Sequence, residues 1–232
     1  MIGQSAIAII ADTLDWERDG AAFHRGAAFS CLDRIESVLS DVPADRAGVR
    51  LRGLPGLREL LNADSPIGAL AAAHIGAGAK PVRAILFDKS PGANWALDWH
   101  QDRTIAVDAH LPVPGFGSET IKAGIPHVEP PFEIIERMVT LRLHLDAVPE
   151  SNAPLLIAPG SHRLGRVLDH AIADVVRQLG SYACLANRGD IWCYSTPIIH
   201  ASAKARKPMR RRVLQVDYSA DSLPGGLQWA GV

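Results

Sequence analysis

The sequence is poor in cysteine and has no excess of positive charge. Cys31, Cys184 and Cys193 are too few and too scattered for a disulfide framework, and the absence of a CxxC pair argues against a zinc site built on thiolates. The 24 Lys and Arg residues are balanced by 25 Asp and Glu residues, which disfavours a nucleic-acid partner held through phosphate contacts. These absences leave a soluble globular protein as the default expectation.

Signals for a membrane or for secretion are also missing. No stretch approaches the run of about 18 consecutive apolar residues that a transmembrane helix needs. The short apolar run near the N-terminus (MIGQSAIAII) has no basic residues before it, so it is not a convincing signal peptide. We therefore expect a cytoplasmic protein with no membrane partner.

Two large classes of enzyme fold lack their motifs here. There is neither a glycine-rich phosphate loop nor the regular alternation of strands and helices that marks a Rossmann fold, and no GxSxG motif of a nucleophile elbow occurs. The chain is nevertheless 47% hydrophobic over 232 residues, which is enough for a sizeable core. We expect one domain over residues 1–232.

Hydrophobic spacing predicts a mostly helical part over residues 1–78 and a strand-rich part over 79–232. Helices are predicted over 28–39, over 57–73 with a break at Ser65 and Pro66, and over 167–179. Strands are predicted over 82–87, 104–109, 138–148, 155–158, 190–194, 197–202 and 211–218. This order indicates an α+β chain, mainly β, whose strands form a barrel or a double-sheet sandwich. The Pro- and Gly-rich residues 111–132 are predicted to be an unstructured lid or binding loop.

Histidine and aspartate recur at metal-ligand spacing. His100 and Asp102 form one HxD triplet, and His144 and Asp146 form another. On a strand, residues i and i+2 point to the same side, so both members of a triplet can reach one ion. A third ligand from another strand, such as His200 at the end of an apolar stretch, would complete a set of two histidines and one carboxylate that suits non-haem Fe(II) oxygenases.

Three longer segments carry a resemblance to a known family. They are LFDKSPGANWALDWHQDRTIAV, LRLHLDAVPESNAPLLIAPGSHRLG and GDIWCYSTPIIHASAKARKPMRRRVLQVDYS, and they run from about residue 86 to residue 219. In order and spacing they resemble the phytanoyl-CoA dioxygenase family of Fe(II)- and 2-oxoglutarate-dependent oxygenases. The resemblance implies a double-stranded β-helix, or jelly-roll, with helices packed on one sheet.

The resemblance also implies roles for particular residues. His100, Asp102 and His200 match the family's iron ligands. Arg211 matches the arginine that binds the distal carboxylate of 2-oxoglutarate, and Ser202 matches a hydroxyl that helps to hold it. The implied cofactors are Fe(II), the cosubstrate 2-oxoglutarate, and O2. Because the chain keeps Asp102, where halogenating relatives have a small residue, hydroxylation or another oxidation without halide is expected.

Three points of the assignment are open to other interpretations. Strand alternation alone slightly favours Arg212 over Arg211 as the inward arginine, and family spacing decides for Arg211. The polar face that carries His144 could line the pocket or meet solvent. The family's Asn-Gly-Pro-Leu reads Asn-Ala-Pro-Leu at residues 152–155, and Ala153 takes positive φ less freely than glycine.

The expected substrate is a small metabolite such as a natural-product intermediate, because no basic cluster for the phosphates of coenzyme A is evident. Two other functions fit part of the pattern. A cupin-type isomerase or hydrolase would need the metal ligands but not Arg211, and a non-catalytic metabolite-binding barrel would need neither. A homodimer is compatible with the sequence, although no feature of it demands one.

Overall fold

The computed structural model describes residues 14–44 and 46–232, and the N-terminal apolar run discussed above lies outside them. Its helices are α1 (Trp16–Asp19), α2 (Leu32–Val38), α3 (Leu57–Leu61), α4 (Gly68–Ile75), α5 (Phe132–Glu136) and α6 (Ile172–Leu179). Its strands are β1 (Ala21–His24), β2 (Val49–Leu51), β3 (Lys80–Lys89), β4 (Leu97–His100), β5 (Ile105–Ala106), β6 (Gly117–Lys122), β7 (Ile125–Glu129), β8 (Val139–His144), β9 (Leu155–Ile157), β10 (Tyr182–Cys184), β11 (Ile191–Ser195), β12 (His200–Ser202) and β13 (Arg211–Ser219). No helix in these residues is long and apolar enough to cross a membrane.

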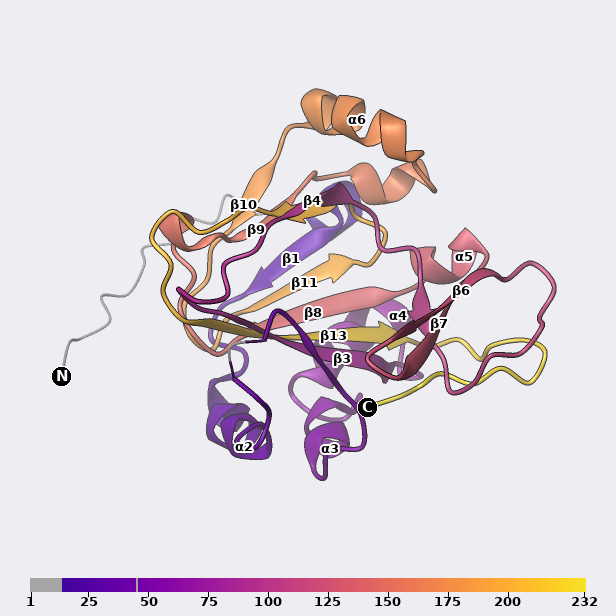
Figure 1. Cartoon of the computed structure of the whole chain (residues 1–232), viewed down its shortest axis with the longest axis horizontal. Coiled ribbons are helices and arrows are strands. Elements are labelled where there is room, and N and C mark those ends of the chain that lie inside the picture. The colour runs from indigo at the N-terminus through magenta and orange to yellow at the C-terminus, as the bar shows by residue number, and fades with distance from the viewer. Residues whose placement is uncertain (1–13, 45) are drawn as a thin grey trace.

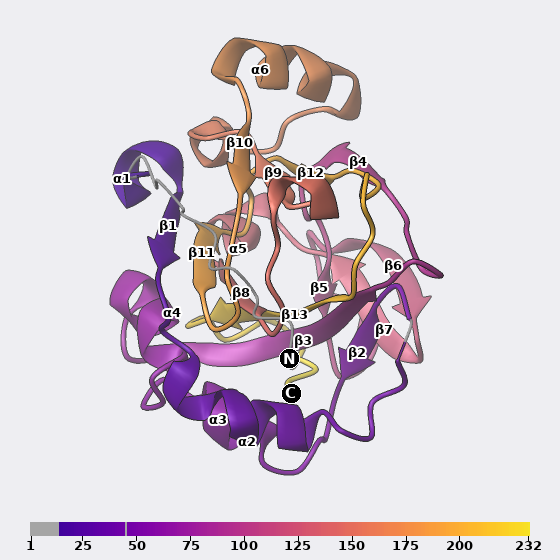
Figure 2. The same cartoon turned by 90° about the vertical axis from the view of Figure 1, so that its left-hand side faces the viewer.

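Two antiparallel sheets face each other across the interior of the molecule (Figures 1 and 2). The major sheet has the strand order β1-β11-β8-β13-β3-β2, and the minor sheet has the order β10-β9-β12-β4. This is the jelly-roll architecture expected from the sequence. The strand predictions that begin at 82, 138, 190 and 211 all fall in the major sheet.

The two faces of the major sheet differ in chemistry because side chains alternate along each strand. On β13, Leu214 and Val216 point outward into a large apolar cluster that the N-terminal helices complete. Gln215 and Asp217 lie on the opposite face, where they bond to the side chains of Arg142 and Thr140 of β8. Helices α2 and α3 lie beneath the sheet, so its outer face forms the main core and its inner face is free to be polar (Figure 1).

The first third is less helical than predicted. The helices expected over 28–39 and 57–73 are present as α2, α3 and α4, with the expected break before residue 68. Strands β1 and β2 were not predicted, and they add to the two edges of the major sheet. Both have four residues or fewer, which is too short to show an alternating pattern.

The segment 111–132 was wrongly predicted to be unstructured, because it forms the hairpin β6–β7, which pairs with β5 in a small third sheet. All but the last residue of β6 are exposed, so the strand lacks the alternation that would reveal it. Its two-residue turn consists of Ala123 and Gly124, with φ of 52° and 77°. Two positive φ angles define a type I′ turn, which usually carries Asn-Gly, so alanine hides the sequence signal.

This turn gives a prediction for stability. Ala123 is exposed and holds a left-handed conformation that costs an L-residue roughly 1–2 kcal/mol. We expect Ala123→Asn to raise the free energy of unfolding by about 0.5–1 kcal/mol, because asparagine tolerates this conformation and no buried methyl group is lost. Urea unfolding measures the change, with Ala123→Val as the matched control that should destabilise the protein. Equal free energies of unfolding for the two variants would contradict the claim that Ala123 is strained.

Candidate metal centre

Two strands of the minor sheet bring three distant residues together. Strands β4 and β12 pair antiparallel, with His100 directly opposite His200. Their rings lie 4.3 Å apart between centroids. Asp102 follows β4, and the ligand atoms of all three residues lie within 4.8 Å of one another. The structure thus gathers the set that the sequence analysis singled out.

His100 and His200 both direct Nδ1 toward a backbone carbonyl oxygen and away from the other two side chains of the set. The Nδ1 atom of His100 lies 2.7 Å from the carbonyl oxygen of Asp98, and that of His200 lies 2.9 Å from the carbonyl oxygen of Ile198. A carbonyl oxygen only accepts, so each Nδ1 carries the proton and each Nε2 presents a lone pair. Burial lowers the pKa of His200 to about 4, which keeps this ring neutral at pH 7. Neutral imidazoles oriented by a backbone carbonyl are typical metal ligands.

Asp102 is kept ionised by a buried arginine. Burial alone would raise the pKa of Asp102, but the guanidinium of Arg83 and the two histidine rings bring it below its usual value. Arg83 Nη2 lies 3.3 Å from a carboxylate oxygen of Asp102, and its Nε donates to Asp217. Thr140 in turn donates to Asp217 at 3.1 Å. Two imidazoles and one carboxylate therefore offer donor atoms that fit a divalent first-row ion such as Fe(II).

The three neighbouring arginines have separate environments. Arg211 begins β13 and is buried with 2% of its surface exposed, and it donates to the carbonyl oxygen of Ala153. Arg210 is exposed and pairs with Asp88, whereas Arg212 pairs with Asp146 at 2.8 Å on the outer face. Arg211 is therefore the inward arginine, and the apolar residues that share a face with Arg212 pack against helices instead.

The turn before β9 contains Ala153 in a left-handed conformation, and this residue is bonded to Arg211. Ala153 has a φ of 53° and a ψ of 63°, the left-handed geometry that glycine would adopt more easily. The alanine at this place therefore keeps the turn, at a cost in strain. Its carbonyl oxygen is the acceptor for Arg211, so the turn also helps to position the guanidinium.

Two further buried cations lie near Arg211, and neither was predicted as a site residue, although Arg142 lies on the polar face that carries His144. Lys89 stands opposite Arg211 in the register of β3 and β13, and its Nζ donates to Ser202 Oγ at 3.1 Å. Arg142 of β8 donates to Gln215 at 2.7 Å. Burial lowers the pKa of Arg211 to about 9, and the charge of Arg142 adds to that effect. In the sequence, the only indication that Lys89 belongs to the site is its position just after an apolar strand, in a chain that has few lysines.

Arg211, Arg142 and Lys89 donate to carbonyl, amide and hydroxyl oxygens, and none of these hydrogen bonds goes to a carboxylate. The Nε atoms of Arg211 and Arg142 are buried without a hydrogen-bond partner, as are both ring nitrogens of His144. A group of buried positive charges without counter-charge is costly, and a bound carboxylate would relieve it. The arrangement fits a dicarboxylate such as 2-oxoglutarate with one end at this group.

The second HxD triplet does not form a comparable site. His144 is 2% exposed and points into the interior, and burial holds its pKa well below the usual value. Asp146 lies beyond the end of β8 and is bound to Arg212 instead. The polar face of β8 therefore lines the interior up to His144 and stops there.

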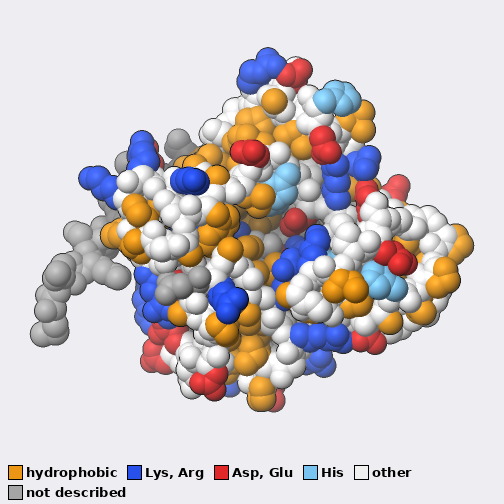
Figure 3. All heavy atoms as spheres, in the orientation of Figure 1, with side chains coloured by type: hydrophobic (Ala, Val, Ile, Leu, Met, Phe, Trp, Pro, Cys, Tyr) orange, Lys and Arg blue, Asp and Glu red, His pale blue; other side chains and the backbone are white. Residues whose placement is uncertain are grey.

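The hairpin β6–β7 approaches the metal centre from the side. Lys122, the last residue of β6, donates to Thr104 at 3.1 Å and lies near enough to Asp102 to lower the pKa of that carboxyl. Figure 3 shows a hollow near the middle of the molecule in which histidine, acidic and basic side chains gather. Asn94, which precedes β4, ties two loops together, because its amide group is bonded to both backbone groups of Ala205.

Comparisons with known proteins identify the family and the fold of the chain. The family model for phytanoyl-CoA dioxygenase (PhyH) matches residues 36–213, and no curated protein matches the sequence. EctD from S. alaskensis, solved with 2-oxoglutarate and 5-hydroxyectoine, is 17% identical over 88% of this chain and 73% of its own, with a TM-score of 0.61.

Two other solved structures share the fold. HygX from Streptomyces hygroscopicus, with nickel and 2-oxoglutarate bound, is 13% identical over 88% of this chain and 84% of its own, with a TM-score of 0.59. The epimerase SnoN from nogalamycin biosynthesis is 14% identical over 94% and 92%, with a TM-score of 0.62. These likenesses show the double-stranded β-helix. Because the family model covers most of the sequence, the chain belongs to the phytanoyl-CoA dioxygenase family, whose cofactors are Fe(II), 2-oxoglutarate and O2.

Proposed function

We propose that the protein is an Fe(II)- and 2-oxoglutarate-dependent dioxygenase that hydroxylates a small metabolite and releases succinate and CO2. The observation that carries the proposal is the pairing of two environments in one interior. A set of three ligand side chains lies within 4.8 Å, and a group of buried cations without carboxylate partners lies nearby. When bound, the iron with O2 and 2-oxoglutarate supplies the oxidising chemistry that the protein's own side chains lack.

In this proposal the ligands are His100, Asp102 and His200. The backbone carbonyl groups hold both rings in the tautomer that presents Nε2, so no reorientation is needed on binding. Arg83 keeps Asp102 ionised and fixes its position through the bridge to Asp217. With Asp102 in place the carboxylate position is filled, which favours hydroxylation over halide transfer.

Arg211 and Ser202 are proposed to hold the distal carboxylate of 2-oxoglutarate. Lys89 would contribute its positive charge, because its Nζ already donates to Ser202 Oγ and to the carbonyl oxygens of Trp95 and Ala203. A guanidinium offers two parallel N–H donors to a carboxylate, which sets the orientation of the bound molecule. Lys89 links the two ends of this group, since its Nζ is bonded to Ser202 and the residue lies opposite Arg211. A metal-dependent isomerase or hydrolase that does not use 2-oxoglutarate would have no need for such a group.

The substrate would enter beside the hairpin β6–β7, where Lys122 approaches Asp102. The solved structures named above include an epimerase and an EctD bound to 2-oxoglutarate and 5-hydroxyectoine, so the fold is found with more than one reaction. Hydroxylation of a small metabolite is our choice among these. We also propose that residues 1–232 form one domain and that the hairpin closes over the substrate as a lid.

Cosubstrate turnover tests the proposal. Full-length protein supplied with Fe(II), 2-oxoglutarate and O2 should form succinate even without the true substrate, at a slow uncoupled rate. Omission of 2-oxoglutarate, or removal of iron by a chelator, should stop O2 consumption. O2-independent activity, or a folded, iron-loaded protein that forms no succinate with candidate substrates present, would favour the isomerase or the binding barrel.

The pKa of Lys89 makes cosubstrate binding depend on pH. Burial and the charges of Arg211 and Arg142 lower this pKa to about 7. A carboxylate favours the charged amine, so the KM for 2-oxoglutarate should rise as pH increases above 7, by up to about tenfold per unit. Lys89→Met should raise the KM at pH 6.5 and flatten the dependence.

The control for this prediction is the exposed Lys204, whose replacement by Met should leave the pH profile unchanged. Initial rates of succinate formation between pH 6 and pH 9 supply the KM values. A profile that is the same in Lys89→Met and in the parent protein would show that the charge of Lys89 plays no part in binding the cosubstrate.

A further inference from the structure

A second group of metal-ligand side chains lies on the outer face of the major sheet. It consists of His24 of β1, His74 of α4 and Cys193 of β11, whose ligand atoms lie within 4.8 Å of one another. Cys193 belongs to the large apolar cluster between the sheet and the N-terminal helices, not to the polar interior. This group is therefore on the opposite side of the sheet from His100, Asp102 and His200.

The fold brings these three residues together from well-separated parts of the chain. In the β1–β11 pairing, His24 lies opposite Ile191 and Cys193 lies opposite Ala22. Residues i and i+2 share a face, so His24 and Cys193 are diagonal neighbours on the outer face. Helix α4 packs on the neighbouring strand β8 and brings His74 over this corner of the sheet.

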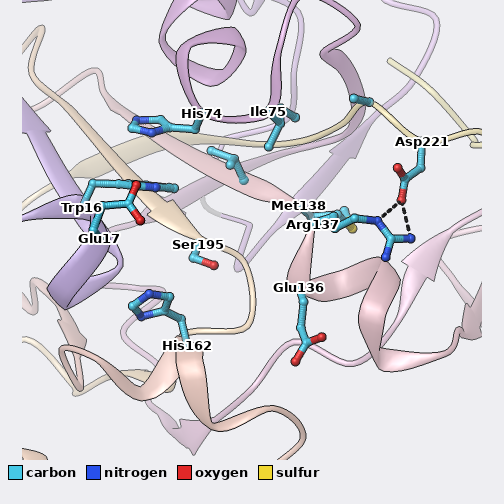
Figure 4. Close-up of a pocket in the computed structure, with 12 residues that line it drawn as sticks. Trp16, Glu17, His74, Ile75, Glu136, Arg137, Met138, His162, Ser195 and Asp221 are labelled. Atoms are coloured by element: carbon cyan, nitrogen blue, oxygen red, sulfur yellow. Dashed lines mark hydrogen bonds and ion pairs between the residues drawn. The ribbon is translucent and has the colours of Figure 1, made fainter.

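Stacking restrains the ring of His74. Trp16 of α1 lies against His74 with ring centroids 3.6 Å apart and an angle of 20° between the planes. Figure 4 shows this pair at one side of a cavity of about 370 Å³, with Ser195 and His162 further along its wall. The stacking restrains His74, and the cavity offers water and ions a route to it.

The donor atoms are available to a cation. The Nε2 atom of His24 is buried and has no hydrogen-bond partner, which is uncommon for a polar atom in a packed region. Burial lowers the pKa of both His24 and His74, which favours the neutral rings that a cation needs. Burial raises the pKa of the Cys193 thiol, so the thiol is protonated in the free protein, and a bound cation has to displace that proton.

We propose that His24, His74 and Cys193 bind a zinc ion, as a second metal site separate from the iron site. Zinc is bound by imidazole nitrogen and thiolate sulfur in four-coordinate sites, and water from the adjoining cavity would be the fourth ligand. The thiolate makes this site suited to zinc, whereas the carboxylate and two imidazoles of the other site suit Fe(II). The ion would tie α4 to the edge of the major sheet.

Cobalt titration of the metal-free, reduced full-length protein tests this site. A thiolate bound to Co(II) gives an intense charge-transfer band in the near ultraviolet, and the iron site contains no cysteine. We expect the intensity of this band to reach a maximum that corresponds to one Co(II) ion per chain at the cysteine site. Addition of Zn(II) should displace this ion and abolish the band. His200→Ala should keep the band, which separates this proposal from the proposed function.

Variants decide which residues are responsible. Cys193→Ala and His74→Gln should lose the band, and Cys184→Ala, which removes another fully buried cysteine, should keep it. If Cys193→Ala fails to fold, His74→Gln on the half-buried face of α4 still tests the site. No thiolate band in the folded parent protein, or a band that persists in either of the first two variants, would overturn the proposal.

Discussion

Arg211→Met should raise the KM for 2-oxoglutarate about a hundredfold or more and leave Fe(II) binding unchanged. The guanidinium is buried and donates to the carbonyl oxygen of Ala153, not to a carboxylate. The cosubstrate would therefore supply the missing negative charge. Loss of one partner from a buried, hydrogen-bonded charge pair typically costs about 2–5 kcal/mol, or about 30-fold to several thousandfold, and the complete burial of Arg211 places the expected loss above the lower end. Initial rates of succinate formation at a series of 2-oxoglutarate concentrations give the value.

Two comparisons show that this effect is specific. Arg210→Met removes an exposed neighbour paired with Asp88 and should change the KM little. Arg211→Lys should recover only part of the affinity, because an ammonium group lacks the paired donors of a guanidinium. Because Arg211 is an uncompensated buried charge in the free protein, Arg211→Met should not lower the free energy of unfolding. An unchanged KM in folded Arg211→Met would remove this residue from the site.

His200→Ala should lower Fe(II) affinity more than about a hundredfold and reduce succinate formation to background. Loss of residues that merely orient a ligand already costs about 10–100-fold in metal affinity, and His200 is proposed as a ligand itself. Its Nε2 presents the lone pair toward His100 and Asp102 because Nδ1 is bonded to Ile198. Equilibrium dialysis with Fe(II) under nitrogen measures the affinity.

His170→Ala is the matched control, because His170 is exposed and lies away from the interior, before α6. It should bind iron as the parent protein does. If His200→Ala kept its iron, the metal would have to be held elsewhere, and the outer group with Cys193 would be the first alternative to examine. The thiolate band described above distinguishes these two positions.

Local sequence patterns predicted the parts of the site that depend on single strands. The spacing of His100 and Asp102 was predicted from two residues on one strand. In the structure β4 ends at His100, and Asp102 lies just beyond it with its carboxylate still close to both histidine rings. The choice of Arg211 over Arg212 could not be made from alternation, because helices cover the outer face of β13 and make it more apolar than the inner one. The spacing seen in the family indicated Arg211. The structure explains why alternation of apolar residues indicated Arg212 instead.

Features that depend on partners far away in the sequence were missed. Lys89 acquires its place only through the register of β3 with β13, which no local pattern contains. The hairpin β6–β7 is a local feature and was missed for another reason, because its first strand is exposed and its turn is Ala-Gly in place of the usual Asn-Gly. The closeness of His24 to Cys193 likewise needs the pairing of β1 with β11.

The central claim is that one interior holds Fe(II) and 2-oxoglutarate together, and anaerobic titration tests it most directly. Metal-free protein is loaded with Fe(II) and then titrated with 2-oxoglutarate, while the visible metal-to-ligand charge-transfer band of the chelate is recorded. We predict a band in the parent protein, none in His200→Ala, and a band that needs far more 2-oxoglutarate in Arg211→Met. Absence of the band in folded, iron-loaded parent protein would contradict the account.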